Sequence, residues 1–354
     1  MRKEGKTMKQ WIKNHPRAAF LTGAVFLSLL FLTYMMRQQN IAAAVEGALT
    51  DEPRSGGAVS SDFYVMQLTG KETEIYNLLR DRLDHMQGGI VEFPEMLSGE
   101  EYLRVTTALE DEGYDYFYGF VDIPMTENGV YIKHGGADLA DVKGKTIAKA
   151  ILFLSCAEGI HLSGEYADDG RVMNLEEVGE ALSANEQEEE EKIRDIQQKT
   201  EEILDGVMSG LPEEYGEKKT ADYFLKWMDE NLAFTTGADG DNVSYSGMKD
   251  VFEELYIYNN LSAVTREKAT ALGYAKILSE LFNRAGMESH IVRGVWGRSQ
   301  FRQEGYVLTA VEMNGQTIYI DAGGAKSAEL GGQRYLREQE AKNHMKFVEY
   351  FDYS

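Results

Sequence analysis

The chain has 354 residues, of which 43% are hydrophobic and 27% are charged. That composition is typical of folded globular domains and excludes collagen, coiled coils and wholesale disorder. Asp and Glu number 59 against 36 Lys and Arg, so the net charge is −23. A surface this acidic repels phosphate backbones, which excludes nucleic acid as an expected partner. The single cysteine, Cys156, excludes an intrachain disulfide and a cysteine-based zinc site.

The N-terminal residues predict a membrane anchor. Residues 1–17 carry six Lys or Arg side chains and one Glu, and residues 18–36 (Ala18 to Met36) carry no charge. A helix of this length, rising about 1.5 Å per residue, crosses the hydrocarbon core of a bilayer. Basic residues stay on the cytoplasmic side of a membrane. We therefore expect a basic cytoplasmic tail over 1–17, a single-pass transmembrane helix over 18–36, and an extracytoplasmic remainder.

A cleaved signal peptide is the alternative, because the alanines at 42–44 are suited to a cleavage site. The apolar stretch is longer than the core of about 7–15 residues that signal peptides have, and the polar residues 37–40 separate it from the alanines. These features favour an uncleaved anchor. A lone cysteine outside the membrane favours a bacterial cell envelope over animal extracellular space, where disulfides are common.

Residues 37–60 are small and polar, with Pro, Gly and Ser, and predict a linker. A small α/β leading domain is expected over 61–184. Its predicted elements are an amphipathic helix over 71–86, a strand over 90–94, a helix that opens at the capping box Ser98 to Glu101, and a hairpin of strands over 114–123 and 130–134. The apolar run at 147–157 fits a helix or a strand.

Residues 185–354 are expected to form a second, α+β domain with a C-terminal helical tail. Helices are predicted around 193–208 and over 217–231, separated by Leu211-Pro212, and a third starts near Lys268 and closes at Asn283 to Gly286. Strands follow at 287–294, 305–313 and 316–321, with Asn314-Gly315 as a type I′ turn. This pattern predicts a helix packed on an antiparallel sheet.

The residues along this third helix and its strands match a family pattern. The matching residues are Lys268, Ala269, Gly273, Tyr274, Ala275, Asn283, Arg284, Gly286, Gly305, Asn314, Gly315 and Asp321. They resemble the bacterial cell-surface branch of the transglutaminase-like superfamily, which has a papain-like arrangement. Its members read approximately Gly-Lys-Ala-x-Cys-x-Gly-Tyr-Ala at the start of the helix, and Gly-His-Ala-Trp-Asn on a following strand.

The resemblance implies a Cys–His–Asp triad, in which a thiolate attacks a carboxamide or peptide carbonyl. In this sequence the cysteine position is Ala271 and the histidine position is Tyr306, and only the aspartate position, Asp321, keeps its residue. A methyl group is no nucleophile, and a phenol with a pKa of about 10 is a poor base at neutral pH. The expectation is a pseudoenzyme without catalytic residues or a cofactor.

Three residues suit a displaced active site. Thr270 lies beside the vacant nucleophile position, His290 falls on the strand after the helix, and Cys156 lies in an apolar run. An active envelope peptidase, amidase or cross-linking acyltransferase is therefore the alternative function. The simpler interpretations are a packed histidine and a buried, inert thiol. A purely structural membrane anchor for a partner protein is a third possibility.

The expected groove between the helix and the sheet is a candidate binding site. The resemblance places Tyr274, Trp296, Tyr306 and Arg298 around it, and aromatic side chains suit protein or cell-wall peptide ligands. Tyr274 as a core residue and Trp296 as a loop anchor are the structural alternatives.

No metal is expected. The six histidines show no ligand spacing. The acidic loop at 239–242 lacks the EF-hand pattern, because Val243 and Ser244 stand where an oxygen ligand and a glycine are needed.

Overall fold

A computed structural model of the chain describes residues 48–54, 57–59, 62–85, 87, 89–112, 119–125, 144–155, 191, 194–235, 260–297, 304–330, 332–347 and 349. The predicted membrane span at 18–36, Cys156, Arg298, the acidic loop at 239–242 and the predicted strand at 130–134 lie outside these residues. Within the described part of the chain, no helix combines the length and the apolar character needed to cross a bilayer.

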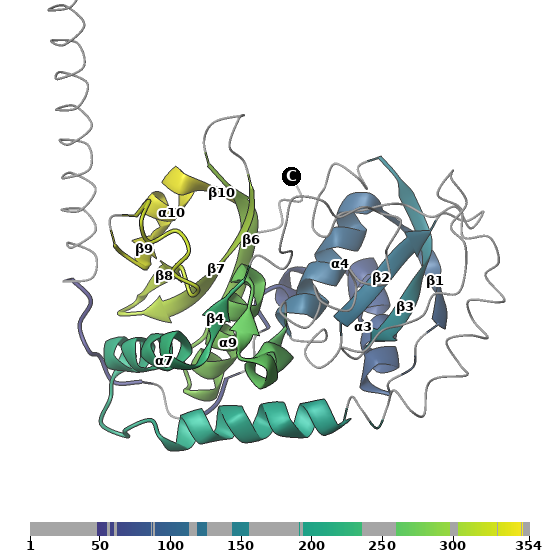
Figure 1. Ribbon diagram of the computed structural model, residues 1–354. Coiled ribbons are helices and arrows are strands. Elements are labelled where there is room, and N and C mark those ends of the chain that lie inside the picture. Colours follow the sequence, from purple (N-terminus) through teal and green to yellow (C-terminus); the bar gives the residue numbers. More distant parts are fainter. Residues whose placement is uncertain are drawn as a thin grey trace, which may run out of the picture.

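The leading domain is a three-stranded antiparallel sheet with two helices packed on it (Figure 1). Its elements in chain order are a short 3-10 helix η1 (Val65–Gln67), α3 (Gly70–Asp84), β1 (Gly89–Ser98), α4 (Gly99–Asp111), β2 (Gly119–Met125) and β3 (Thr146–Ser155). The two predicted helices are confirmed. The ambiguous apolar run forms β3, the central strand of the order β1-β3-β2, and β3 is the antiparallel partner of β2.

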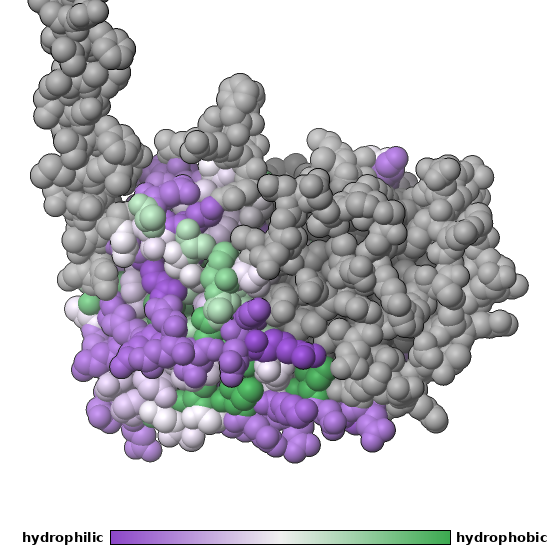
Figure 2. Space-filling view, viewed as in Figure 1, coloured by the Kyte–Doolittle hydropathy of each residue, from purple (hydrophilic) through white to green (hydrophobic). Residues whose placement is uncertain are grey.

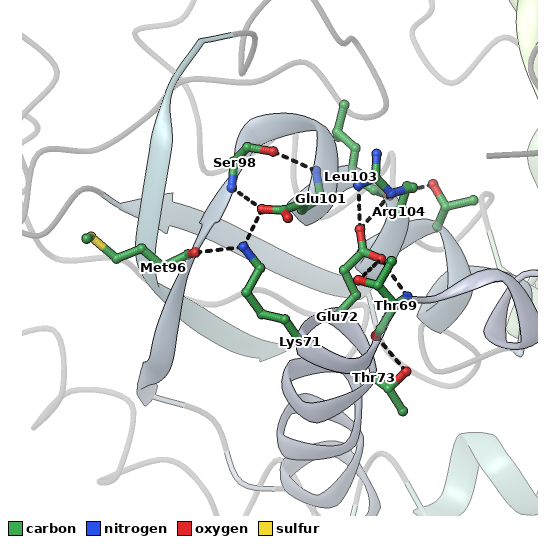
Figure 3. Close-up of polar contacts among 10 residues, drawn as sticks. Thr69, Lys71, Glu72, Thr73, Met96, Ser98, Glu101, Leu103 and Arg104 are labelled. Atoms are coloured by element: carbon green, nitrogen blue, oxygen red, sulfur yellow. Dashed lines mark hydrogen bonds and ion pairs between the residues drawn. The ribbon is translucent and has the colours of Figure 1, made fainter. Parts of the chain in front are cut away.

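Capping boxes fix the starts of both helices, and two ion pairs, Arg104–Glu72 and Lys71–Glu101, join the helices (Figure 3). The Ser98 amide donates to Glu101 Oε2 at 2.6 Å, and Thr69 and Glu72 form the equivalent box in α3. Glu72 is fully buried and its Oε1 also accepts from the Arg104 guanidinium at 2.6 Å. A buried carboxylate is costly unless it is paired, so these bonds fix how α3 lies against α4.

The second domain is built on a curled five-stranded antiparallel sheet of order β10-β6-β7-β8-β9 (Figure 1). Its elements are α7 (Glu217–Asn231), β4 (Ala233–Phe234), the 3-10 helix η4 (Leu261–Arg266), β5 (Lys268–Ala269), α9 (Ala271–Arg284), β6 (Ser289–Trp296), β7 (Glu304–Met313), β8 (Gln316–Ile320), β9 (Tyr335–Arg337), α10 (Glu338–His344) and β10 (Met345–Phe347). The helix α9 packs on β6 and β7. This confirms a mixed α+β domain with a helix on an antiparallel sheet.

The β7–β8 hairpin closes at the predicted turn. Asn314 and Gly315 have φ values of 54° and 68°, and positive φ at both central positions is what a type I′ turn requires. In the described part of the C-terminal stretch, up to residue 349, the helix is the seven-residue α10. The short strands β9 and β10 on either side of α10 add to opposite edges of the sheet.

A helix over residues 194–209 joins the two domains. Ile196, near its start, packs against the core of the leading domain, whereas Leu204 and Val207 are buried in the core of the second domain. Figure 2 shows hydrophilic residues over the outer faces of this helix and of α7, with hydrophobic residues in the seam between them. One amphipathic helix therefore contacts both cores.

Residues 48–54, here called the strap, lie against the second domain although they belong to the predicted linker. The Thr50 amide donates to Asn314 Oδ1 at 2.7 Å, and Asn314 Nδ2 donates to the Thr50 carbonyl at 3.0 Å. Asp51 pairs with Lys219 at 2.9 Å. These contacts hold part of the predicted linker, residues 50–51, against the second domain.

Candidate functional site

The start of α9 carries Ala271, the position to which the sequence resemblance assigns the nucleophile. Thr270 is the N-cap, and its side-chain oxygen accepts from the Gly273 amide at 3.4 Å. Ala271 is the first residue of the helix. The positive end of the helix dipole lies here and would stabilise a thiolate, but the methyl group of Ala271 instead packs against the buried cluster that contains Trp296 and Tyr306.

The other two triad positions are in direct contact. Tyr306 lies at the start of β7 and Asp321 follows the last residue of β8, and the antiparallel register brings the two strand ends together. The Tyr306 hydroxyl donates to Asp321 Oδ1 at 2.6 Å. Since Ala271 packs against the same cluster as Tyr306, the structure gathers all three positions in one place.

Burial decides the protonation of this pair. Asp321 is completely buried, and loss of solvation raises the pKa of its carboxyl group above the ordinary value, although the bonds from Tyr306 and from the Lys326 amide oppose that rise. Burial, together with the neighbouring carboxylate, raises the pKa of the Tyr306 phenol far above its ordinary value. Tyr306 therefore stays protonated and serves as a hydrogen-bond donor.

The segment after β8 folds over this pair. The Lys326 amide donates to Asp321 Oδ2 at 2.9 Å. Arg334 donates to the carbonyls of Asp321 and Ala322, at 3.1 Å and 2.5 Å, and its guanidinium pairs with Asp229 of α7 at 2.8 Å. These contacts hold residues 321–330, here called the covering loop, against the ends of β7 and β8.

Trp296 joins the covering loop to the sheet. Its indole nitrogen donates to Glu329 Oε2 at 3.0 Å. Its ring makes an edge contact with Tyr306 at 5.4 Å and stacks on His344 at 5.5 Å between ring centres. The Lys326 ammonium lies 5.2 Å from the centre of the Tyr306 ring, close enough for a cation–π contact.

The described residues of the predicted groove fall into two hydrophobic clusters. Trp296 and Tyr306 share the cluster just described, with 3% and 6% of their surface exposed. Tyr274 belongs to the other core, where its hydroxyl donates to the Leu232 carbonyl at 2.8 Å and its ring packs near Phe234. Burial raises the pKa of Tyr274 to about 12. Trp296 and Tyr306 thus share one cluster, whereas Tyr274 belongs to another, in which its ring lies near Gly323 of the covering loop.

The candidate for a displaced base lies in a different cluster. His290, on β6, places its Nε2 at 2.7 Å from Glu349 Oε1, and the ring of Phe63 stacks on it at 3.6 Å between centres. Tyr319 donates to the other oxygen of Glu349 at 2.6 Å. His290 is buried by these contacts. No group of His, Cys, Asp or Glu suited to a metal ion occurs among the described residues.

Sequence reasoning missed the side chains that hold this region together. Glu329, Lys326 and Arg334 follow the hairpin in a stretch of Gly, Ala and charged residues that reads as a surface turn. The two glycines at 323–324 were a signal that the backbone bends tightly there: Gly324 has a φ of 64° and lies against the Arg334 guanidinium. The sequence does not predict the partners of these side chains, because Asp229, Trp296 and Tyr306 come from α7, β6 and β7.

No protein-family model matches the chain, and no curated protein matches it in sequence. Solved structures are similar over part of its length. One is a candidate cysteine protease from Cytophaga hutchinsonii, with 9% identity, covering 42% of this chain and 46% of that one, at a TM-score of 0.27. Another is a TGase with 17% identity, covering 57% of this chain and 47% of that one, also at 0.27. The chain therefore spans just under half the length of each of these proteins. The chemistry of its site is inferred from its own residues.

Proposed function

We propose that residues 185–354 are a transglutaminase-like domain without acyl-transfer chemistry, a pseudoenzyme. The observation that carries this proposal is the buried bond from the Tyr306 hydroxyl to Asp321. It occupies the aspartate that would orient a histidine, while Ala271 contributes only packing at the helix start. Nucleophile and base are both missing, and losing both removes covalent catalysis of the triad type.

The test is an acyl-transfer assay on the full-length protein. A glutamine-containing peptide and a fluorescent primary amine are the substrates, and release of ammonia is followed in parallel. We expect no turnover above the enzyme-free background. The double variant Ala271→Cys/Tyr306→His, which restores the family's nucleophile and base, serves as the matched comparison. Turnover by the wild type that Thr270→Val or Cys156→Ser abolishes would overturn the proposal and favour the alternative enzyme.

We also propose that the domain binds protein or cell-wall peptide beside the covering loop. Trp296 and Tyr306 supply aromatic surface with polar tips, and the loop that covers them is fastened at its far side by the Arg334–Asp229 pair, whose carboxylate is half exposed. Ion pairs at such positions contribute little stability, about 0–1 kcal/mol. Displacing the covering loop would uncover both rings for a peptide.

Binding is measured by titrating a muropeptide fraction into the full-length protein and following tryptophan fluorescence. We expect a saturable change that Trp296→Phe removes. Trp227→Phe, at a half-buried position of α7 that packs against the other core cluster, is the matched control and should keep the change. A signal that survives in Trp296→Phe would place any binding elsewhere.

The proposed location is a membrane with the N-terminus in the cytoplasm and the bulk of the chain outside. Support comes from the charge-free residues 18–36 and the basic tail over 1–17. In cells, the protein should stay in the pellet after alkaline carbonate extraction. Protease added to spheroplasts should digest everything except the short tail and the span. Release of the intact protein by carbonate would contradict the anchor.

A further inference from the structure

The covering loop is a compact turn closed by its own backbone. The amides of Glu329 and Leu330 both donate to the Lys326 carbonyl, at 2.9 Å and 3.0 Å. Bonds of this spacing bend the chain as a helical turn does, so side chains four positions apart lie on the same side. Leu330 is buried and the Lys326 side chain is only 12% exposed, whereas Ala325 and Ala328 are exposed. The turn thus has an inner side that carries Lys326 and Leu330.

Lys326 makes two separate contacts with the site. Its backbone amide donates to Asp321 Oδ2 at 2.9 Å, and its ammonium lies 5.2 Å from the centre of the Tyr306 ring. An aromatic face attracts a cation, and a carboxyl oxygen accepts from an N–H donor. One residue therefore satisfies both groups, because it is a lysine whose amide is turned toward the strand ends.

The next contacts follow three and four positions later. Glu329 accepts from the Trp296 indole nitrogen at 3.0 Å. Leu330 is 4% exposed and belongs to the cluster that contains Trp296 and Tyr306. The Glu329 carboxylate stays at the rim, 4.0 Å from the Lys326 ammonium. The loop therefore presents a cation, an acid three positions on and an aliphatic side chain four positions on, and the site has a complementary group for each.

The groups that receive these three side chains do not depend on the turn for their position. Trp296 ends β6, Tyr306 lies near the start of β7, and Asp321 directly follows β8. They remain on the sheet when residues 322–330 move away. Without a replacement, the Trp296 indole and Asp321 Oδ2 would each lose a hydrogen-bond partner, which is costly for groups in a largely apolar cluster. A ligand that exchanges for the turn must therefore supply the same contacts.

We propose, on the basis of the proposed binding beside the covering loop, that the ligand is a protein segment with a turn that presents lysine, glutamate three positions on and leucine or another large aliphatic residue four positions on. The covering loop is its tethered competitor. A ligand on a short tether has an effective concentration in roughly the millimolar range, so a free segment that makes only the same contacts binds poorly while the loop is closed. The pair that fastens the loop, Arg334–Asp229, has a half-exposed carboxylate, and such pairs contribute little to stability.

The experiment uses a fluorescein-labelled synthetic peptide with the sequence of residues 322–333. It is titrated into the full-length protein in detergent, and binding is followed by fluorescence anisotropy. In the double variant Lys326→Met/Glu329→Met the loop loses its ammonium and its carboxylate, and the residues on the sheet are unchanged. We expect this variant to bind the peptide about tenfold more tightly than the wild type.

The matched control is Lys226→Met/Glu230→Met. It removes the same two charges from an exposed pair on α7, where the side chains lie 3.8 Å apart. It should bind the peptide as weakly as the wild type does. Asp229→Asn provides a second route to a looser loop, because it weakens the fastening to Arg334 and changes neither the turn nor the sheet. It should also strengthen binding, and it tests the proposal independently of how the double variant folds.

Two altered peptides test recognition itself. Methionine in place of the peptide's lysine, or in place of its glutamate, should weaken binding to the double variant by about fivefold. When Trp296→Phe is added to the double variant, replacing the glutamate should no longer weaken binding, because the indole donor is absent. A loop that is only looser would not produce this loss of discrimination.

Equal affinity of the wild type, the double variant and Asp229→Asn for the peptide would overturn the proposal. So would equal affinity of the double variant for the unaltered and the methionine peptides. A muropeptide response that depends on Trp296, combined with no binding of the peptide at millimolar concentration, would leave the proposed binding function intact and overturn this identification of the ligand. Acyl-transfer activity would be detected in the separate assay and would overturn the pseudoenzyme proposal alone.

Discussion

The hydrogen bond from Tyr306 to Asp321 joins two side chains that are both enclosed by the covering loop. Replacing Tyr306 by Phe keeps the ring and removes the donor, leaving a buried carboxyl oxygen without that partner. The expected loss in the free energy of unfolding is about 1–3 kcal/mol, measured by urea denaturation. Tyr215→Phe, at a half-buried position before α7, is the control and should change stability by far less. An equal loss in the free energy of unfolding for the two variants would contradict this prediction.

Asp321 also predicts a pH dependence. Because burial raises the pKa of its carboxyl group, the folded state binds this proton more readily than the unfolded state. Its contribution to stability is then highest in acid and decreases as the pH rises from about 3.9, the unfolded value, through the raised pKa. Asp321→Asn keeps an acceptor for Tyr306 and removes the charge. We therefore expect the free energy of unfolding of Asp321→Asn, relative to that of the wild type, to be higher at pH 7 than at pH 4. Denaturation curves at the two pH values provide the measurement.

Among the elements, the strap depends on one glycine at the start of α7. A Cβ atom on Gly216 would lie 2.3 Å from the Glu52 carbonyl oxygen and 2.6 Å from that of Asp51. Gly216→Ala should therefore displace the strap while α7 remains intact. Trypsin provides the measurement, since Arg54 is held by a bond to the Tyr215 carbonyl at 2.9 Å. Cleavage after Arg54 should become at least tenfold faster in the variant.

The matched control for the strap is Gly206→Ala. Nothing lies within 4 Å of a Cβ atom at Gly206, which is inside the helix over 194–209. Alanine is favoured over glycine in a helix by about 0.5–1 kcal/mol. Gly206→Ala should leave the cleavage rate at Arg54 unchanged and raise the free energy of unfolding. Unchanged cleavage in Gly216→Ala would show that the strap does not need this close approach.

At the scale of the whole molecule, we predict that both domains unfold together. The helix over 194–209 contacts both cores, and Arg293 of β6 pairs with Glu110 of α4. Arg293 lies 2.5 Å from Glu110, and Arg293→Met removes this partner. The Glu110 carboxylate then keeps its charge at a largely buried position without the arginine that compensated it. We expect a single thermal transition in the wild type by calorimetry and a broadened or split transition in Arg293→Met. Arg80→Met removes a surface pair with Asp84, 3.8 Å away within the same helix, and should leave one transition.

Much of the order of helices and strands can be predicted from short stretches of the sequence. The helix α7 runs over Glu217–Asn231 as its apolar spacing predicts, the capping box at Ser98 opens α4, and Asn314-Gly315 makes the hairpin turn. Each of these signals lies within a few residues of the chain, where hydrogen bonds of caps and turns are made. The apolar run that begins at 147 lacks such a signal, and its described part, up to Ser155, is a strand because it pairs with a neighbouring strand on each side.

The sequence by itself determined the main helices and the hairpin of the second domain, the apolar face of α9 and the residue types at positions 271 and 306, because residue type and periodicity are properties of the chain. Only the tertiary structure decided that Tyr306 donates to Asp321, that Trp296 donates to Glu329, and that Lys276 of α9 is buried. These contacts join residues from separate elements. Their chemistry depends on burial and on charges brought close by folding, which no spacing along the chain encodes.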